Sequence, residues 1–328
     1  QDQDILAKSG QTYAIASFTV ADFQAVMTGN NTGCVVDTDG DGVPDDVDDF
    51  PNDGDRAFVN YYPAAGKGTL AYEDLWPGMG DFDMNDMVLN YRFKTITNSD
   101  NKVVEMEAEF TLLAFGASYK NGFGFQFPSS SIDQNNISVS GSNISESYVT
   151  LGSNGLESGQ SKPTFIVFDN AFDLMAAQPG YIGVNTDPNA IFREPETITL
   201  NIDFSTPVYT MAQINIENFN PFIIVNRDRG REVHLPYYAP TDLVNQNLFG
   251  TSGDASVPAE GKYYVNEGNL PWAINLPEQY AWPREKKDIT NVYTHFESWA
   301  ETGGTSNANW YVNQVGNILD IQDVIILP

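Results

Sequence analysis

Seven aspartates lie within the thirteen residues DTDGDGVPDDVDD, residues 37–49. Alternate acids, a glycine at the sixth position and further acids at the ninth and twelfth match the twelve-residue loop that binds calcium. Calcium takes about six to eight hard oxygens, so a bound cation would offset the repulsion among these carboxylates. We therefore expect a calcium site with these ligands, in loop order: Asp37, Asp39, Asp41, the Val43 carbonyl, Asp45, and Asp48 in place of the usual glutamate.

A second acidic segment, EDLWPGMGDFDMNDMVLNYRF, begins at Glu73. Its alternate polar residues precede an expected strand and share the parity of Met87 and Leu89 in that strand. Strand geometry extended backwards would turn these oxygens toward the core, which is costly unless a cation or hydrogen-bond donors meet them. Two interpretations stay open, a polar turn and a calcium site formed by Asp81, Asp83, Asn85 and Asp86 with Glu73 or Asp74.

The flanks of the first loop differ from those of a helix-loop-helix site, because Pro44 lies inside the loop and no amphipathic helix is expected on either side. The segment DTDGDGVPDDVDDFPNDGDR instead resembles a thrombospondin type-three repeat, in which aspartates of adjacent turns bind calcium in an irregular wrap. That resemblance implies a second ion, held by Asp46, Asp49, Asp53 and Asp55. The alternative is a solvated acidic linker, the usual role of a charge run.

The balance of charge excludes several classes of partner. The chain has 328 residues with 44 acids and 16 bases, a formal net charge of -28. This charge repels nucleic acids and anionic membrane surfaces, whereas metal cations and neutral ligands are compatible with it. Cys34 is the single cysteine, so neither an intrachain disulfide nor a cysteine-based metal site is expected. No apolar run spans a membrane, and a start at Gln1 suggests a processed, exported chain.

The elements that must position these sites read mainly as strands. Apolar residues alternate with polar ones in residues 102–115 and 197–204, and strand-like patterns also occupy residues 123–127 and 213–226. Turn residues separate the runs, which predicts an all-β, antiparallel β-sandwich of jelly-roll type. One or two short helices are expected, over residues 288–304 and 240–250, and residues 12–27 predict a strand or a short helix.

Four segments carry a resemblance to a bacterial family. They are GTLAYEDLWPGMGDFDMNDMVLNYRF, ASYKNGFGFQFP, REVHLPYYAPTDLVNQNLFG and NLPWAINLP. Together they resemble the LruC-domain family of extracytoplasmic, often lipoprotein-like surface proteins, from about Gly68 to the C-terminus. The resemblance implies a secreted or surface-anchored β-rich module and brings no established reaction. We expect an N-terminal segment, residues 1–60, with the acidic loop at 37–56, followed by a sandwich domain over residues 61–328.

Catalytic motifs are not found in the sequence. His234 and His295 are expected to be structural hydrogen-bonding residues, and no HExxH, GxSxG, phosphate loop or complete GxGxxG occurs. A glycosidase needs only two suitably spaced carboxylates, so a carbohydrate-active enzyme stays open as an alternative. Aromatic residues in the C-terminal third predict either core packing or an exposed shelf for a sugar or protein ligand, formed by Trp272 and Trp282.

These patterns together predict a non-catalytic, calcium-stabilised module with calcium as its cofactor. We expect it outside the cytoplasm, at the outer membrane or cell surface of a bacterium or secreted, where it serves adhesion or the binding of a surface glycan or protein. A lipid anchor outside this sequence is compatible with that interpretation. The alternatives are the carbohydrate-active enzyme and a structural subunit of a surface layer or fimbria-like fibre, which would present an edge strand to its partner.

Overall fold

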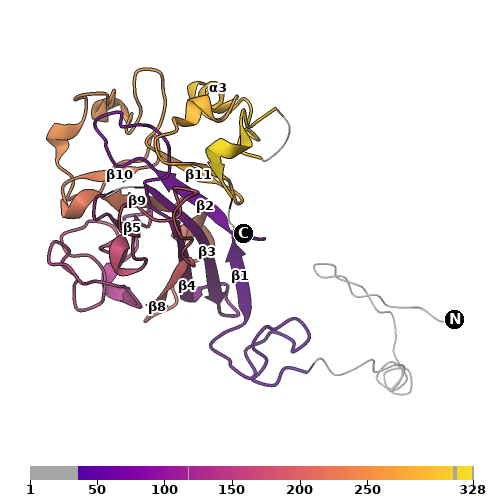
Figure 1. Cartoon of the computed structure of the whole chain (residues 1–328). Helices are drawn as coiled ribbons and strands as arrows, with labels where there is room; N and C mark the ends of the chain where they lie inside the picture. The colour runs from indigo at the N-terminus through magenta and orange to yellow at the C-terminus, as the bar shows by residue number, and fades with distance from the viewer. Residues whose placement is uncertain (1–35, 117, 313–315, 327–328) are drawn as a thin grey trace, which may run out of the picture.

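The computed structural model describes residues 36–116, 118–312 and 316–326 (Figure 1). Its strands are β1 Phe58–Tyr62, β2 Gly68–Tyr72, β3 Met87–Thr97, β4 Val103–Ala114, β5 Gly122–Gln126, β6 Ile137–Ser140, β7 Thr164–Phe168, β8 Glu196–Phe204, β9 Asn220–Ile224, β10 Glu232–His234, β11 Ala273–Leu276, β12 Trp282–Pro283 and β13 Val324–Ile325. The predicted domain boundary between residues 60 and 61 falls inside β1, so the sandwich begins at Phe58.

The strands form two antiparallel sheets and one small ribbon. The larger sheet has the order β11-β2-β3-β4-β8-β6, and β1 pairs with the end of β3 beyond β2. The second sheet has the order β10-β9-β5-β7, and β12 pairs with β13. Aromatic side chains join the two sheets: the rings of Phe110 and Phe123 lie 5.0 Å apart, and those of Phe93 and Phe125 lie 5.6 Å apart. The predicted all-β sandwich is confirmed.

The strand alternation seen in the sequence is the alternation of core and surface. In β4, Met106, Ala108 and Phe110 are buried, while Glu107 on the other face pairs with Lys94 of β3 at 2.9 Å. β8 repeats the pattern, with every second side chain from Ile198 onward buried. A strand turns successive side chains to opposite faces, so a run of this kind can bury only one set.

A second hydrophobic cluster covers the outer face of the larger sheet near β2, β3 and β11. Ala71, Val88 and Ile274 of the sheet pack there against Trp282 and Trp310 of the C-terminal segment. The C-terminal segment therefore forms a third layer. In Figure 1 it lies, with α3, at the end of the molecule opposite the loop that precedes β1.

Helical segments are short. They are α2 Met211–Ile214 and α3 Phe296–Glu301, with 3-10 turns at η1 Gln134–Asn136, η2 Ala171–Asp173, η3 Ile216–Asn218, η4 Val225–Arg227, η5 Gln246–Leu248, η6 Pro258–Glu260, η7 Ile289–Asn291 and η8 Ile321–Asp323. The helix expected over residues 240–250 is reduced to η5. The element expected over residues 12–27 lies outside the described residues.

The helix expected over residues 288–304 is broken in two, into η7 and α3. Asp288 accepts a hydrogen bond from the backbone N–H of Thr290, as an N-cap should. The interruption follows because the N–H of Thr294 donates to the Asn317 carbonyl and Leu319 donates to the Val292 carbonyl. Tertiary backbone pairing therefore replaces the helical hydrogen bonds at this point, and only the second half continues as an α-helix.

The strand expected over residues 213–226 is confirmed only at β9. Its first part forms α2 and η3, because Thr210 and Gln213 make a capping box that starts a helix. Asn215 then ends α2 in the left-handed conformation, at φ 55°. Local capping thus overrides the alternation of apolar residues, which was the basis of the strand prediction.

Candidate metal centres

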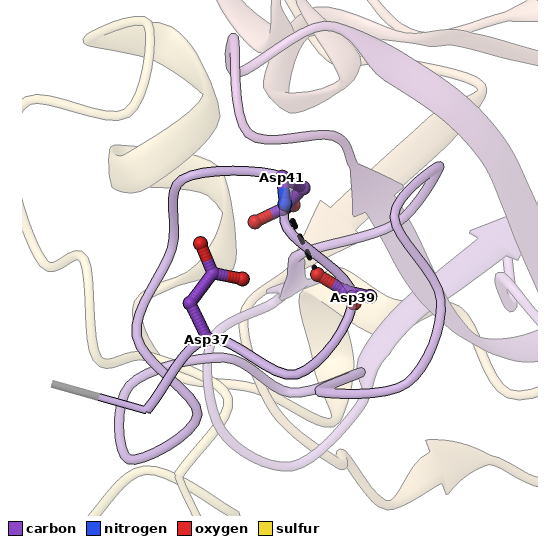
Figure 2. A group of neighbouring side chains, drawn as sticks. All are labelled: Asp37, Asp39 and Asp41. Atoms are coloured by element: carbon purple, nitrogen blue, oxygen red, sulfur yellow. Dashed lines mark hydrogen bonds between the residues drawn. The ribbon is translucent and has the colours of Figure 1, made fainter. Parts of the chain in front are cut away.

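The first acidic loop brings together three of its predicted ligands. Asp37, Asp39 and Asp41 each offer a carboxylate oxygen, and these oxygens lie within 4.8 Å of one another (Figure 2). Ligands of one calcium ion at about 2.3–2.6 Å can be separated by such distances. Gly40 and Gly42, at φ 80° and 96°, allow the tight turn that gathers the three side chains.

Backbone N–H groups orient the carboxylates of this loop. Asp37 accepts from Gly40 and Gly42 at 2.8 and 3.1 Å, and Asp39 accepts from the N–H of Asp41 at 3.2 Å, the dashed line in Figure 2. The second carboxylate oxygens of Asp39 and Asp41 are buried and have no hydrogen-bond partner among the residues that the structure describes. They are therefore available to a cation.

The remaining predicted ligands of this loop have different roles. Asp48 is buried and one of its oxygens has no partner within the described residues, which fits a ligand. Asp45 is instead held by Thr38, which donates to both of its carboxylate oxygens at 2.7 Å, so a direct role for Asp45 at position nine is not supported. Val43 is buried, and the part played by its carbonyl stays a prediction.

The second ion implied by the thrombospondin-type resemblance has no assembled site. Asp49 accepts from the N–H of Val59 at 2.7 Å, and Asp53 pairs with Arg56 at 2.8 Å. Asp46 and Asp55 are exposed. Within the described chain, no three of these four aspartates form a group with ligand spacing, so the structure lends the second ion no support and its site stays a prediction. The carboxylates of Asp49 and Asp53 instead contact residues at the join between the loop and β1.

The second acidic segment forms a group of carboxylates, all buried except that of Asp81, where β2 ends and β3 begins. These strands are antiparallel neighbours, with Tyr72 opposite Met87. The residues that follow β2 therefore meet the residues that precede β3. Two overlapping groups result, each with carboxylate oxygens within 4.8 Å of one another: Glu73, Asp81 and Asp83 in one, and Glu73, Asp74 and Asp86 in the other.

The loop that enters β3 has an unusual backbone. β3 begins at Met87, so the strand geometry expected to extend backwards from it is absent from residues 81–86. Phe82 and Met84 instead adopt left-handed conformations, at φ 57° and 52°, and both side chains are buried in the second hydrophobic cluster. Bulky residues rarely adopt this conformation, and such strain gathers at functional sites.

Glu73 is the central residue of this group. It is fully buried, and neither of its carboxylate oxygens has a hydrogen-bond partner among the described residues. The side-chain oxygen of Asn85, also buried, is without a partner in the same part of the chain. An ionised carboxylate in such a place is very costly unless a cation or a proton neutralises it. We call Glu73, Asp74, Asp81, Asp83, Asn85 and Asp86 the buried centre.

Burial and mutual repulsion disfavour the charged forms of the four buried acids, Glu73, Asp74, Asp83 and Asp86. Burial raises the pKa of Glu73 and of Asp86 well above the ordinary value, and neighbouring carboxylates add to both shifts. Burial raises the pKa of Asp83 to about 8, with Asp81 as the next cause. Burial also raises the pKa of Asp74 to about 6. A divalent cation would reverse these shifts, because it favours the ionised forms.

Several neighbours fix the orientation of the centre, and the sequence analysis did not identify them. Asn121 donates to Asp74 at 2.7 Å, and Arg231 donates to the carbonyl of Asp74 at 3.2 Å. The N–H of Lys286 donates to Asp83 at 2.8 Å. These residues come from loops far away in the chain, and no spacing in the sequence connects them to the acidic segment.

Two glycines leave room for the buried oxygens. A Cβ at Gly80 would lie 2.2 Å from Glu73 Oε1, and a Cβ at Gly116 would lie 1.8 Å from Asn85 Oδ1. The same Cβ at Gly116 would lie 2.9 Å from Glu285 Oε2, which places the Glu285 carboxylate beside the buried centre. Burial raises the pKa of Glu285 to about 7, and the charge of Asp81 adds to the shift. Glu285 is therefore a further candidate ligand.

The aromatic shelf predicted from Trp272 and Trp282 is wrong. Both side chains are buried, with exposed fractions of 0% and 1%. Their indole N–H groups donate to the carbonyls of Gly78 and Asn185, at 2.7 and 3.0 Å. Both tryptophans are core residues, which was the alternative interpretation of this segment.

The two histidines lie in different surroundings in the described part of the chain. His234 is buried, with its ring nitrogens at 2.7 Å from Asn220 and 2.8 Å from Glu232, as a structural residue would be. His295 precedes α3, and its side chain makes no capping hydrogen bond there. Among the described residues, no helix has the length and hydrophobicity needed to cross a membrane.

Comparison with known proteins relates the chain to a domain family of unknown function and to a solved structure of similar fold. The model of a family described as a domain of unknown function, DUF4842, matches residues 101–311. A crystal structure of a candidate lipoprotein from Bacteroides ovatus superposes with a TM-score of 0.58 at 20% identity, over 82% of this chain and 76% of that one. At that identity the likeness concerns the fold. No curated protein matches the sequence.

Proposed function

Because the chain belongs to the DUF4842 family, a family without an assigned reaction, we propose its function from the geometry of the acidic sites: it is a calcium-binding, non-catalytic module that acts in adhesion or ligand binding at a bacterial surface. Neither the LruC-domain resemblance nor the thrombospondin-type resemblance is needed for this proposal. Its basis is the buried centre.

One observation carries the calcium assignment. The Glu73 carboxylate is buried with both oxygens unpartnered among the described residues, and it belongs to both groups of carboxylates. A cation satisfies both oxygens and offsets the repulsion, whereas protonation of Glu73 removes one charge and leaves the charges of the other carboxylates uncompensated. The two overlapping groups share Glu73, so the centre offers two cation positions that this residue bridges.

The charges of the centre favour two divalent cations. Five carboxylates carry five negative charges when ionised, and Arg231 adds one positive charge beside Asp74. Two divalent cations balance the remaining four. Calcium is the cation that fits, because the donors are carboxylate and amide oxygens without a histidine or cysteine, and because calcium accepts irregular arrangements better than magnesium does.

The proposed location outside the cytoplasm has two supports. Extracellular calcium is abundant enough for sites with a Kd of about 10⁻⁴ to 10⁻³ M. The structural neighbour from Bacteroides ovatus is a candidate lipoprotein, which is compatible with a surface role for a protein of the same fold. A lipid anchor outside this sequence would serve such a role.

Thermal unfolding in calcium and in EDTA tests the proposal. At a calcium concentration about 100 times Kd, one site adds about 2.7 kcal/mol to the free energy of unfolding. We expect the midpoint of the wild-type protein to rise by about 5 °C or more in calcium. Glu73→Gln should lose most of that rise, whereas the control Glu196→Gln, at an exposed position of β8, should keep it. An equal midpoint in calcium and EDTA for the wild type would refute calcium binding by the centre.

A carbohydrate-active enzyme is the second candidate. The observation in its favour is that two carboxylates, Asp187 and Glu285, line one cavity beside the centre. Turnover on a panel of glycans that Glu285→Gln abolishes would establish the enzyme and end the non-catalytic proposal. Binding without turnover is the result that we expect.

A further inference from the structure

A cavity of about 500 Å³ lies beside the buried centre. Three segments line it: residues 180–182, residues 186–189 and residues 284–287. Its volume is in the range of about 300–1,000 Å³ that small-molecule sites occupy. Glu285 belongs to its wall and also lies beside Asn85 of the centre, while the N–H of Lys286 donates to Asp83. The cavity and the centre therefore share one loop.

Basic residues gather in that loop. Arg284, Lys286 and Lys287 are three of the 16 bases of the chain and fall within four consecutive residues. Arg284 and Lys287 both pair with Asp323, at 2.7 and 3.0 Å. Lys286 is exposed at the wall of the cavity. The protein has a net charge of -28, so most of its surface repels anions. This group of basic residues is an exception and can attract one.

The charge of the cavity depends on the state of Glu285. Three basic residues are balanced by Asp187, Glu285 and Asp323, so the group is neutral when all are ionised. A calcium ion in the centre, close to Glu285, makes the electrostatic potential at this wall less negative than it is in the calcium-free protein. Calcium in the centre therefore favours a ligand with one negative charge in the cavity.

The remaining wall is suited to a sugar ring. The hydroxyl of Thr186 is buried, lines the cavity and has no hydrogen-bond partner among the described residues. Asn189 adds amide donors and an acceptor, and Tyr181 adds an aromatic face on which the C–H groups of a sugar can pack. A carboxylate-bearing sugar combines the anion, the hydroxyl groups and the apolar face that this wall requires.

We propose that this cavity binds an acidic sugar, a uronic acid unit, and that it does so only when calcium occupies the adjacent centre. The inference rests on the proposed calcium binding and adds a ligand class to it. Lys286 contacts the sugar carboxylate, Thr186 accepts or donates a hydrogen bond to a ring hydroxyl, and Glu285 transmits the presence of calcium to the cavity.

The test compares methyl α-galacturonoside with methyl α-galactoside, which lacks the carboxylate. Saturation-transfer NMR on the full chain, with affinities from titration, is run in calcium and in EDTA after circular dichroism has established that the fold is retained. We expect the galacturonoside to bind in calcium alone and the galactoside to bind at least about tenfold more weakly. Lys286→Gln should weaken galacturonoside binding by about tenfold, whereas the control Lys262→Gln, in the turn after η6, should not.

The outcomes separate this inference from the calcium proposal. If the wild type binds calcium but not galacturonoside, or binds the two glycosides equally, the cavity assignment is wrong and the calcium proposal is untouched. Galacturonoside binding that persists in EDTA, or that Lys286→Gln leaves unchanged, overturns the inference as well. Calcium titration of Lys286→Gln should match the wild type, since its side chain is not a ligand. Failure of the wild type to bind calcium at all refutes both proposals.

Discussion

Gly80 leaves little free space beside the carboxylate oxygens of the buried centre. A Cβ there would lie 2.2 Å from Glu73 Oε1, so we predict that Gly80→Ala weakens calcium binding at the centre by about tenfold or more. Gly261→Ala is a matched control, because Gly261 has a similar φ, 70° against 65°, but no atom within 4 Å of its Cβ position. Calcium titration of both variants checks the prediction. Equal losses of calcium affinity in the two variants would mean that backbone strain, and not contact with Glu73, weakens binding.

The raised pKa values of the centre predict how stability depends on pH. In the calcium-free protein, Asp74 and Asp83 have pKa values of about 6 and about 8, above the value of about 4 expected for an unfolded chain. The folded state therefore binds more protons than the unfolded state between pH 4 and 8, and its free energy of unfolding falls as the pH rises through that range. Saturating calcium should remove most of this slope, because the carboxylates then stay ionised in the folded state.

Unfolding in urea at several pH values, in EDTA and in calcium, measures this dependence. The general repulsion in a chain with net charge -28 also lowers stability at higher pH, so Asp83→Asn is the necessary comparison. That variant should show a smaller slope in EDTA than the wild type does. Two results would contradict the assignment of raised pKa values to the centre. One is a free energy of unfolding in EDTA that increases as the pH rises, and the other is a pH dependence that is the same in Asp83→Asn and the wild type.

For individual residues, the sequence predicted part of the candidate sites. Alternate aspartates and glycines identified Asp37, Asp39 and Asp41, because their ligand geometry is a local property of one loop. The six residues of the buried centre were also identified, with a polar turn left as the alternative. Glu285 escaped prediction, because its position beside Asn85 depends on how the C-terminal segment folds back over the sheet.

Edge strand β10 is held by an ionic network that no sequence pattern revealed. Arg229 pairs with Glu157 and Glu232, all three nearly or fully buried, and His234 bonds Glu232 at 2.8 Å. Although burial alone would raise the pKa of Glu232, the hydrogen bond with His234 and the charge of Arg229 lower it to about 2. Glu232 therefore stays ionised, and the network ties the loop before β7 to β10.

Removal of the arginine should leave two buried carboxylates without their partner. We predict that Arg229→Met lowers the free energy of unfolding by about 3–5 kcal/mol. Arg227→Met is the control, because Arg227 is exposed and pairs with Glu146 only at 3.4 Å, a contact worth about 0–1 kcal/mol. Urea unfolding gives both values. A loss below about 1 kcal/mol for Arg229→Met would show that the network contributes little.

The elements themselves were predictable where one face of a strand is buried and the other is solvated. β4 and β8 meet that condition, and their alternation was sufficient. β5 and β9 are buried throughout, so periodicity could not place the start of β9 after the capped turn at Thr210. The break between η7 and α3 depends on backbone pairing with residues near Asn317, which a local pattern does not record.

For the whole molecule, the two acidic sites lie in different surroundings. The loop of residues 36–57 extends from the end of the sandwich beyond β1 in Figure 1. The buried centre instead lies between β2, β3 and the C-terminal layer, next to the second hydrophobic cluster. Calcium in the centre would therefore stabilise the packing of the sheet against the C-terminal segment. Calcium in the loop would stabilise mainly the join before β1.

Calcium titration of the metal-free protein by calorimetry, on the wild type and Glu73→Gln, tests the central claim most directly. Among the described residues three groups have ligand spacing, and two of them share Glu73. We therefore predict three calcium ions for the wild type and one, in the loop of residues 36–57, for Glu73→Gln. No calcium binding by the wild type, or the same stoichiometry and affinity in both proteins, would contradict the claim that Glu73 joins two calcium ions in a buried centre.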